Sequence, residues 1–104
     1  MSRATDYTND AQQRILKLLL ALCGDPVIGY PPSKLAELLR CNPSAITRDL
    51  DNLRTAGMAQ RDEATGCWVL TPCIPQQSIK VYTAIDRAQR RVDEARNRFT
   101  RTPD

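Results

Sequence analysis

Residues 33–58 read SKLAELLRCNPSAITRDLDNLRTAGM, and this stretch decides the fold. Its apolar residues recur at intervals of three and four, which predicts helices that each turn one face inward. One helix runs from Ser33, whose side chain can cap it, through Arg40. Asn42 followed by Pro43 predicts the start of the next helix, because asparagine caps a helix and proline suits its first position. The stretch therefore predicts two helices joined by a tight turn.

The same spacing predicts which side chains of these two helices are buried. The later helix ends at about Ala56, before Gly57. The inward residues are Leu35, Leu38 and Leu39 in the helix of residues 33–40, and Ile46, Leu50 and Leu53 in the helix of residues 43–56. The far face of the later helix is polar.

Another helix precedes this pair, from about Asp10 to Cys23, with Asn9 or Thr8 as its cap and Gly24 as its end. It carries more apolar residues than one buried face needs. One stripe consists of Ile15, Leu18, Leu19 and Leu22, and a second consists of Leu16, Leu20 and Cys23. We therefore expect this helix to be covered on two sides.

Beyond Gly57 the pattern changes from helical to extended. Residues 58–61 and 67–71 are predicted strands, and residues 62–66 form a loop whose glycine suits a hairpin. Pro72 and Pro75 are expected to end the hairpin, and a long helix is predicted from about Gln76 to Thr100. The predicted fold class is mainly α with a small β-hairpin, divided into a domain of residues 1–74 and a C-terminal helix of residues 75–104.

In this order of elements the chain resembles bacterial winged helix-turn-helix transcriptional regulators of the MarR and ArsR type. The resemblance covers about residues 33–72 and is carried by LAELLRCNPSAITRDLDNL at 35–53 and AGM at 56–58. It implies a sequence-specific regulator of transcription that binds double-stranded DNA as a dimer, with the helix of residues 43–56 in the major groove.

The chain departs from this family pattern in two places. Arg40 stands where glycine is common, so Arg40 or Cys41 must adopt a strained conformation or the turn must differ. The predicted hairpin corresponds to the wing of this family. Asp62 and Glu63 stand at its tip, where basic residues would favour contact with phosphates.

If the helix of residues 43–56 enters the major groove, its outward residues near the N-terminus are expected to meet base edges and phosphates. These residues are Ser44, Ala45, Thr47, Arg48 and Asp51. Contacts with the phosphate backbone are expected from Ser33, Lys34, Arg54 and Arg61. Arg48 is the best single candidate for guanine or phosphate. The alternative is a solvated helix face on which Arg48 pairs with Asp51 or Asp49.

The last helix has the pattern of a coiled-coil seam, because small and apolar residues recur at alternating intervals of three and four. They are Ser78, Val81, Ile85, Ala88, Val92, Ala95 and Phe99. A parallel pair would set Arg91 against Arg96 of the other chain, so antiparallel pairing or packing against the first helix is favoured. We expect a homodimer held by this seam together with Leu16 and Leu20. In the alternative, the last helix folds back on its own domain.

Composition argues against catalysis and metal binding. The chain has no histidine, and its four cysteines, at 23, 41, 67 and 73, form no C-x-x-C pair, so no metal site and no cofactor are expected. It has no nucleophile motif and no glycine-rich phosphate loop, so it is not expected to be an enzyme. Cys23 and Cys41 are expected to be buried thiols. Because no apolar run could span a bilayer and residues 1–10 are polar, a cytoplasmic protein without membrane contact is expected.

Charge leaves two functions open. Residues 1–74 hold eight Lys/Arg and eight Asp/Glu, whereas residues 75–104 hold seven and four, so the excess behind the net charge of +3 lies wholly in the last segment. A DNA-binding domain is often more basic than this neutral first part. The alternative function is therefore a winged-helix adaptor that binds a protein and not DNA.

Overall fold

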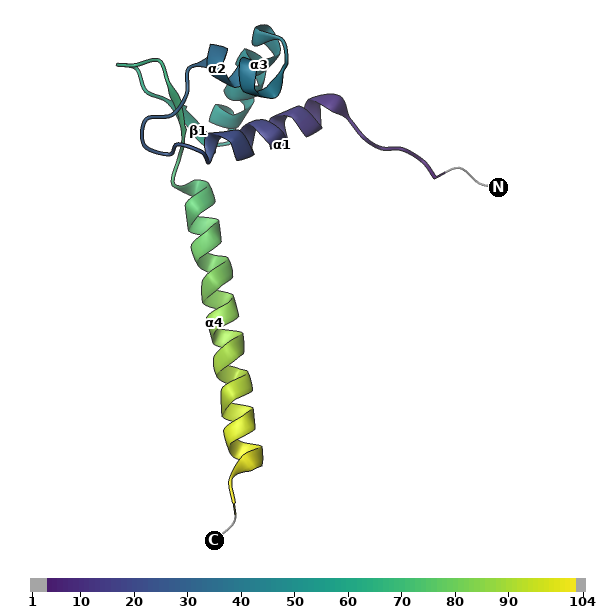
Figure 1. Cartoon of the computed structure of the whole chain (residues 1–104), viewed down its shortest axis with the longest axis vertical. Coiled ribbons are helices and arrows are strands. Elements are labelled where there is room, and N and C mark those ends of the chain that lie inside the picture. Colours follow the sequence, from purple (N-terminus) through teal and green to yellow (C-terminus); the bar gives the residue numbers. More distant parts are fainter. Residues whose placement is uncertain (1–3, 103–104) are drawn as a thin grey trace. The chain divides into compact units, whose positions relative to one another are not determined.

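The structure is a computed structural model that describes residues 4–102, and it is mainly helical with one antiparallel hairpin (Figure 1). The elements in chain order are α1 (Asp10–Leu22), α2 (Pro32–Leu39), α3 (Pro43–Thr55), β1 (Ala59–Arg61), β2 (Trp68–Leu70) and α4 (Cys73–Thr100). The chain divides into two compact units, of which the first ends at Pro72 and the second begins at Cys73. The predicted fold class, a winged helix-turn-helix with a long C-terminal helix, is confirmed.

The helix starts follow the capping residues in two of three cases. The Asn9 side-chain oxygen accepts a hydrogen bond from the Gln12 amide at 3.0 Å, and the Asn42 oxygen accepts one from the Ser44 amide at 2.8 Å. Both predicted asparagine caps are therefore confirmed. The predicted cap of α2 at Ser33 is wrong, because α2 begins one residue earlier at Pro32, with no side-chain cap. The residue at the cap position of α2 is Pro31, whose side chain has no oxygen that could accept a hydrogen bond from the first-turn amides.

The turn after α2 and the turn after α3 share one backbone pattern. The Arg40 amide donates to the Glu37 carbonyl at 3.2 Å, and the Cys41 amide donates to the Ala36 carbonyl at 3.1 Å. After α3, Gly57 and Met58 form the same two bonds at the corresponding positions, and Gly57 has φ 78°. This Schellman pattern needs a left-handed residue, which glycine supplies without strain. Arg40 adopts it at φ 52° and ψ 50°, which confirms the expected strain in this turn.

A small sheet covers one end of the helices. β1 and β2 pair antiparallel with Ala59 opposite Leu70, and Tyr30 adds a bridge to the free side of Trp68 through hydrogen bonds of 3.1 and 2.8 Å. Gly29, at φ 79°, precedes this bridge, and a β-carbon there would come within 2.2 Å of the Trp68 carbonyl oxygen. The Tyr30–Trp68 bridge thus joins the connection after α1 to the hairpin, and only a glycine at position 29 lets the two backbones come this close.

Asp25 shapes the start of the same connection. Its carboxylate accepts hydrogen bonds from the Ile28 amide at 2.9 Å and from the Val27 amide at 3.1 Å. These bonds, that of Ile28 first, hold the pKa of Asp25 below its ordinary value, because they favour the charged carboxylate. The turn is therefore ordered by a side chain that remains ionised at neutral pH.

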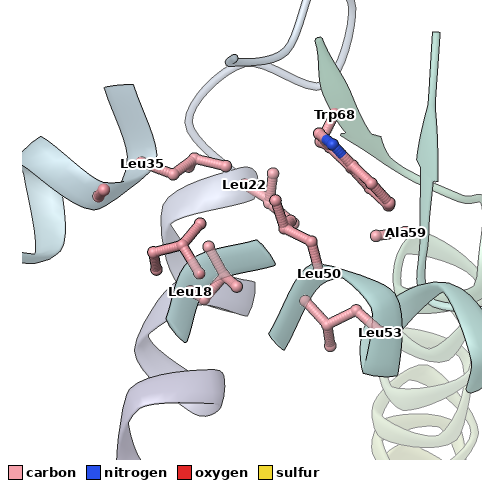
Figure 2. Close-up of a cluster of buried hydrophobic side chains, with 9 residues drawn as sticks. Leu18, Leu22, Leu35, Leu50, Leu53, Ala59 and Trp68 are labelled. Atoms are coloured by element: carbon pink, nitrogen blue, oxygen red, sulfur yellow. The ribbon is translucent and has the colours of Figure 1, made fainter. Parts of the chain in front are cut away.

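The core lies where the three helices and the hairpin meet (Figure 2). Its buried members are Leu18, Leu22, Leu35, Ala36, Ile46, Leu50, Leu53, Ala59 and Trp68. The inward positions predicted for α3 are confirmed, and so are Leu18 and Leu22 in α1. Two predictions are wrong: the Leu38 side chain is 51% exposed, and Cys23 is exposed just beyond the end of α1. A helix of only eight residues, such as α2, turns little more than two leucine side chains toward one core.

The second unit is a single helix of 28 residues, about 42 Å long. It begins at Cys73, three residues before the predicted start, and Pro75 lies in its first turn and not at the end of the hairpin. Proline is tolerated there because the first-turn amides have no partner within the helix. None of the side chains of α4 is buried. No described helix is long and apolar enough to cross a membrane.

Candidate nucleic-acid interface

The outer face of α3 carries the predicted contact residues together. Ser44, Thr47, Arg48 and Asp51 are all exposed, and so is Arg54 near the C-terminus of the helix. Ser44 is held at the first turn, because its hydroxyl and its amide both donate to the Asn42 side chain. The Thr47 hydroxyl donates back to the Pro43 carbonyl at 3.1 Å. The cap that starts the helix thus also orders its first polar side chains.

The outward position predicted for Ala45 is wrong. Ala45 is 7% exposed, and the buried face of α3 continues from it through Ile46, Asp49 and Leu50. At about 100° per residue, Ala45 lies about 40° from Asp49 and about 80° from Leu53 around the helix axis, on the edge of the buried face. It is therefore a packing residue and not part of the candidate interface.

The Arg48 guanidinium is exposed and makes no ion pair among residues 4–102. The two acids that the alternative assigned to it are engaged elsewhere. Asp51 pairs with Arg54 at 2.5 Å, and Asp49 pairs with Arg14 of α1. The alternative of an Arg48 pair with Asp49 or Asp51 is therefore wrong, and Arg48 presents its full charge and all its donors to whatever meets this face.

Arg14 and Asp49 form an ion pair that joins α1 to α3 beneath this face. The Arg14 Nε donates to one Asp49 oxygen at 2.5 Å, and the Nη2 donates to the other at 3.0 Å. Asp49 is 5% exposed, and Arg14 is the cation that compensates its buried carboxylate. The hydrogen bond with Asp49 raises the pKa of Arg14 above its ordinary value. The bidentate geometry fixes how α3 is seated on α1.

Sequence reasoning missed this pair, although Asp49 itself gives a signal. Asp49 lies three residues after Ile46 and four before Leu53, which places an acid on the apolar stripe of α3. An acid in that position needs a cation from another element. Which element supplies it depends on how the helices pack, and the pattern of a single helix does not contain that information.

Two more exposed polar residues on α3 were also missed. Asn52 follows Arg48 by one turn and donates to its backbone carbonyl at 2.9 Å, and Thr55 lies three turns after Ser44 on the same face. Both positions follow from the helical spacing that identified Ser44 and Arg48. They extend the exposed face to the last turn of the helix.

The residues expected to meet the phosphate backbone come from three elements. Ser33 and Lys34 are exposed in the first turn of α2, and Arg54 is exposed on α3. Arg61 lies on β1 and pairs with Glu63 at 3.2 Å. Arg40 also presents a cation, from the turn between α2 and α3. The exposed cations without an ion pair in the described first unit thus include Lys34, Arg40 and Arg48.

The wing is short and carries mixed charge. Residues 62–66 close it through hydrogen bonds from Asp62 to Cys67 and from Gly66 to Asp62, at 2.8 and 2.7 Å. The Asp62 carboxylate also accepts from the Ala64 amide at 2.9 Å. Two acids therefore stand beside the single cation of the wing, Arg61, and the pair with Glu63 reduces what that cation offers to a phosphate.

The surfaces expected to hold a dimer are exposed in both units. In α1, Leu16 and Leu20 point away from the core, and Leu20 is 72% exposed. In α4 the seam residues Val81, Ile85, Ala88, Val92 and Phe99 are exposed, and Ala95 is half-buried. Among the described residues no group of three or more Cys, Asp or Glu side chains is arranged to hold a metal ion.

No protein-family model matches the sequence, and no curated protein matches it. Two solved structures are similar in shape, and both are mutant forms of ZitR from Lactococcus lactis. Their TM-scores are 0.47 and 0.46, at 19% and 21% sequence identity. Each match covers 96% of this chain, and 69% and 68% of the respective ZitR chain.

Proposed function

We propose that this chain is a sequence-specific DNA-binding regulator of transcription that acts as a homodimer, with α3 in the major groove. The observation that supports this most is the outer face of α3. Its central cation, Arg48, has no ion pair in the described chain, while the neighbouring acids Asp49 and Asp51 are each engaged by another arginine. A free guanidinium on an exposed helix of a helix-turn-helix is suited to bidentate contact with guanine.

The other residues divide by the kind of contact they offer. Ser44, Thr47 and Asp51 lie beside Arg48 and are proposed to meet base edges or nearby phosphates. Ser33, Lys34, Arg54 and Arg61 are proposed to bind phosphates, which position the protein without reading sequence. The Arg48 side chain is thus the proposed source of specificity, and the rest orient α3 in the groove.

The proposed dimer uses the exposed apolar residues of α1 and α4. A dimer places two copies of α3 on one duplex, which is how helix-turn-helix proteins read two half-sites. We propose the unit that ends at Pro72 as the DNA-binding domain and α4 as the dimerisation helix, two residues earlier than the predicted boundary at residue 75. The apolar seam residues of α4 are exposed, and apolar side chains left open to water favour association.

The test is a titration of the 104-residue chain onto a labelled pool of duplexes, followed by anisotropy at about 50 mM and about 200 mM salt. We expect binding that weakens steeply with salt. Arg48→Ala should then weaken the free energy of binding to the sequence selected from the pool by about 1–3 kcal/mol. The matched control is Arg90→Ala, which removes an exposed arginine from the outer face of α4 and should leave binding nearly unchanged.

The second candidate function is a winged-helix adaptor that binds a protein. The neutral charge of residues 1–74 and the acids of the wing favour it. Absence of binding at both salt concentrations would decide for the adaptor. Binding that persists unchanged in Arg48→Ala would leave a DNA-binding protein but remove α3 as its reading element.

A further inference from the structure

We propose that α4 pairs with α4 of a second copy of this chain in antiparallel orientation, in the register that sets Ile74 opposite the second copy's Phe99. This proposal rests on the homodimer of the proposed function but not on contact with DNA. It adds the direction and the register of the pairing, and it names the residues that meet.

The first argument is that none of the 28 residues of α4 is buried, and that Phe99 is 81% exposed. A helix surrounded by water is only marginally stable, and most helices gain their stability from packing an apolar face. The exposed apolar residues of α4 therefore need an occupant.

The apolar face is longer than the predicted seam. Going backward from Ser78 by four residues reaches Ile74, which is half-buried and continues the alternation of three and four. Ile74, Val81 and Ile85 line one shallow groove along the surface of α4, together with Tyr82. The seam thus extends from Ile74 to Phe99, nearly the whole length of the helix.

The length of this seam decides between the possible helical occupants. α1 has 13 residues and offers only Leu16 and Leu20 on its exposed apolar stripe. It covers no more than half of a seam that runs from Ile74 to Phe99. A second α4 has the same length and the same spacing, so it covers the seam from end to end.

Antiparallel pairing matches the side chains across the seam. In an antiparallel coiled coil each a position of the heptad faces a d position of the partner helix. Centring the overlap on the seam gives four kinds of layer, each formed twice. The layers set Ile74 opposite Phe99, Ser78 opposite Ala95, Val81 opposite Val92, and Ile85 opposite Ala88. The large side chains of Ile74 and Phe99 meet at the two ends of the overlap. In the layers between them, each serine or alanine faces either another small residue or a single isoleucine, so these layers are not overfilled.

The charges beside the seam distinguish the two directions. The flanking positions of α4 contain three arginines, Arg91, Arg96 and Arg98, and no acid. In a parallel pair Arg91 faces the second copy's Arg96, and this repulsion occurs twice. In the antiparallel register Arg91 faces the second copy's Ala84, and Arg98 faces its Gln77. Antiparallel pairing therefore separates like charges that parallel pairing brings together.

The experiment measures the dissociation constant of the whole 104-residue chain by sedimentation, with fluorescently labelled protein diluted into the nanomolar range. Ala84→Glu places a carboxylate opposite Arg91 twice in the antiparallel register. We expect the dissociation constant to fall about three- to fivefold. Thr83→Glu is the matched control, because it adds the same charge near the same helical neighbours, Lys80 and Arg87, but on the outer face. Its dissociation constant should stay close to that of the unchanged chain.

Arg96→Glu tests the opposite direction, because it creates an attraction to Arg91 only in a parallel pair. Two results would overturn the proposal. One is a lower dissociation constant for Arg96→Glu together with an unchanged one for Ala84→Glu. The other is a chain that stays monomeric at every concentration measured. The DNA titration with Arg48→Ala is run on the same proteins. If no variant binds DNA but Ala84→Glu still tightens the dimer, the pairing stands and the proposed function fails.

Discussion

Arg40 adopts a left-handed backbone conformation, at φ 52°, that β-carbon sterics disfavour. The equivalent residue after α3 is Gly57, which forms the same pattern of hydrogen bonds without that cost. The two turns share the capping hydrogen bonds and differ in the side chain at the left-handed residue. The turn between α2 and α3 is therefore strained at one residue while its hydrogen bonds are complete.

Arg40→Gly is accordingly expected to raise the free energy of unfolding by about 1 kcal/mol. Urea denaturation of the 104-residue chain measures the change. The matched control is Glu37→Gly, three residues earlier within α2, which should lower the free energy of unfolding by about 1 kcal/mol because glycine is a poor helix former. Equal destabilisation by both changes would mean that the left-handed conformation carries no strain.

At this scale the sequence predicted the asparagine caps and the strain at Arg40, because each depends on residues within one turn of the chain. It did not predict that Ala45 is buried and Leu38 exposed. Those outcomes depend on how wide the covered face of each helix is, and neighbouring elements set that width. Burial at the edge of a helix face is thus a tertiary property.

At the scale of elements, the Arg14–Asp49 pair links the first helix to the third. Removing Arg14 leaves a carboxylate that is 5% exposed without its partner, whereas replacing both residues with apolar ones leaves no unpaired charge. The pair therefore makes the seating of α3 depend on α1, although the two helices are separated by α2 in the chain.

A double-mutant cycle tests this dependence. We expect Arg14→Met alone to lower the melting temperature more than the double variant Arg14→Met, Asp49→Leu, because the double variant buries no unpaired carboxylate. Thermal unfolding followed by calorimetry measures each variant. Additive effects of the two changes would contradict a direct energetic link between the helices.

The order and type of the elements were predictable because their periodicities are strong. Their ends were less so: α4 starts at Cys73 with Pro75 in its first turn, whereas proline was expected to end the hairpin. Proline is compatible with both a turn and the first turn of a helix. The choice between them is made by the residues around it, and these carried no decisive signal.

At the scale of the whole molecule, all members of the buried core lie before residue 69, and none lies in α4. A fragment of residues 1–72 is therefore expected to fold with a cooperative thermal transition and to remain monomeric. Calorimetry and sedimentation of the fragment measure the two properties. In the fragment, Leu50→Ala should lower the free energy of unfolding by about 2–5 kcal/mol, because it opens a cavity in the core.

A fragment without a cooperative transition would show that the first unit depends on α4 for its folding. A fragment that forms dimers as tight as those of the full chain would instead assign association to α1 alone. Dimerisation of the whole chain but not of the fragment is the outcome that the proposed division of roles requires.

Trp68 is the only tryptophan of the chain, and it is 8% exposed against the core of the first unit. Its emission therefore reports on that unit alone. Circular dichroism in the far ultraviolet sums over all four helices, and α4 is the longest of those described. Wherever the two signals change at different temperatures or concentrations, the long helix melts or associates separately from the domain that carries α3, so this one indole lets the two units be followed independently without any added label.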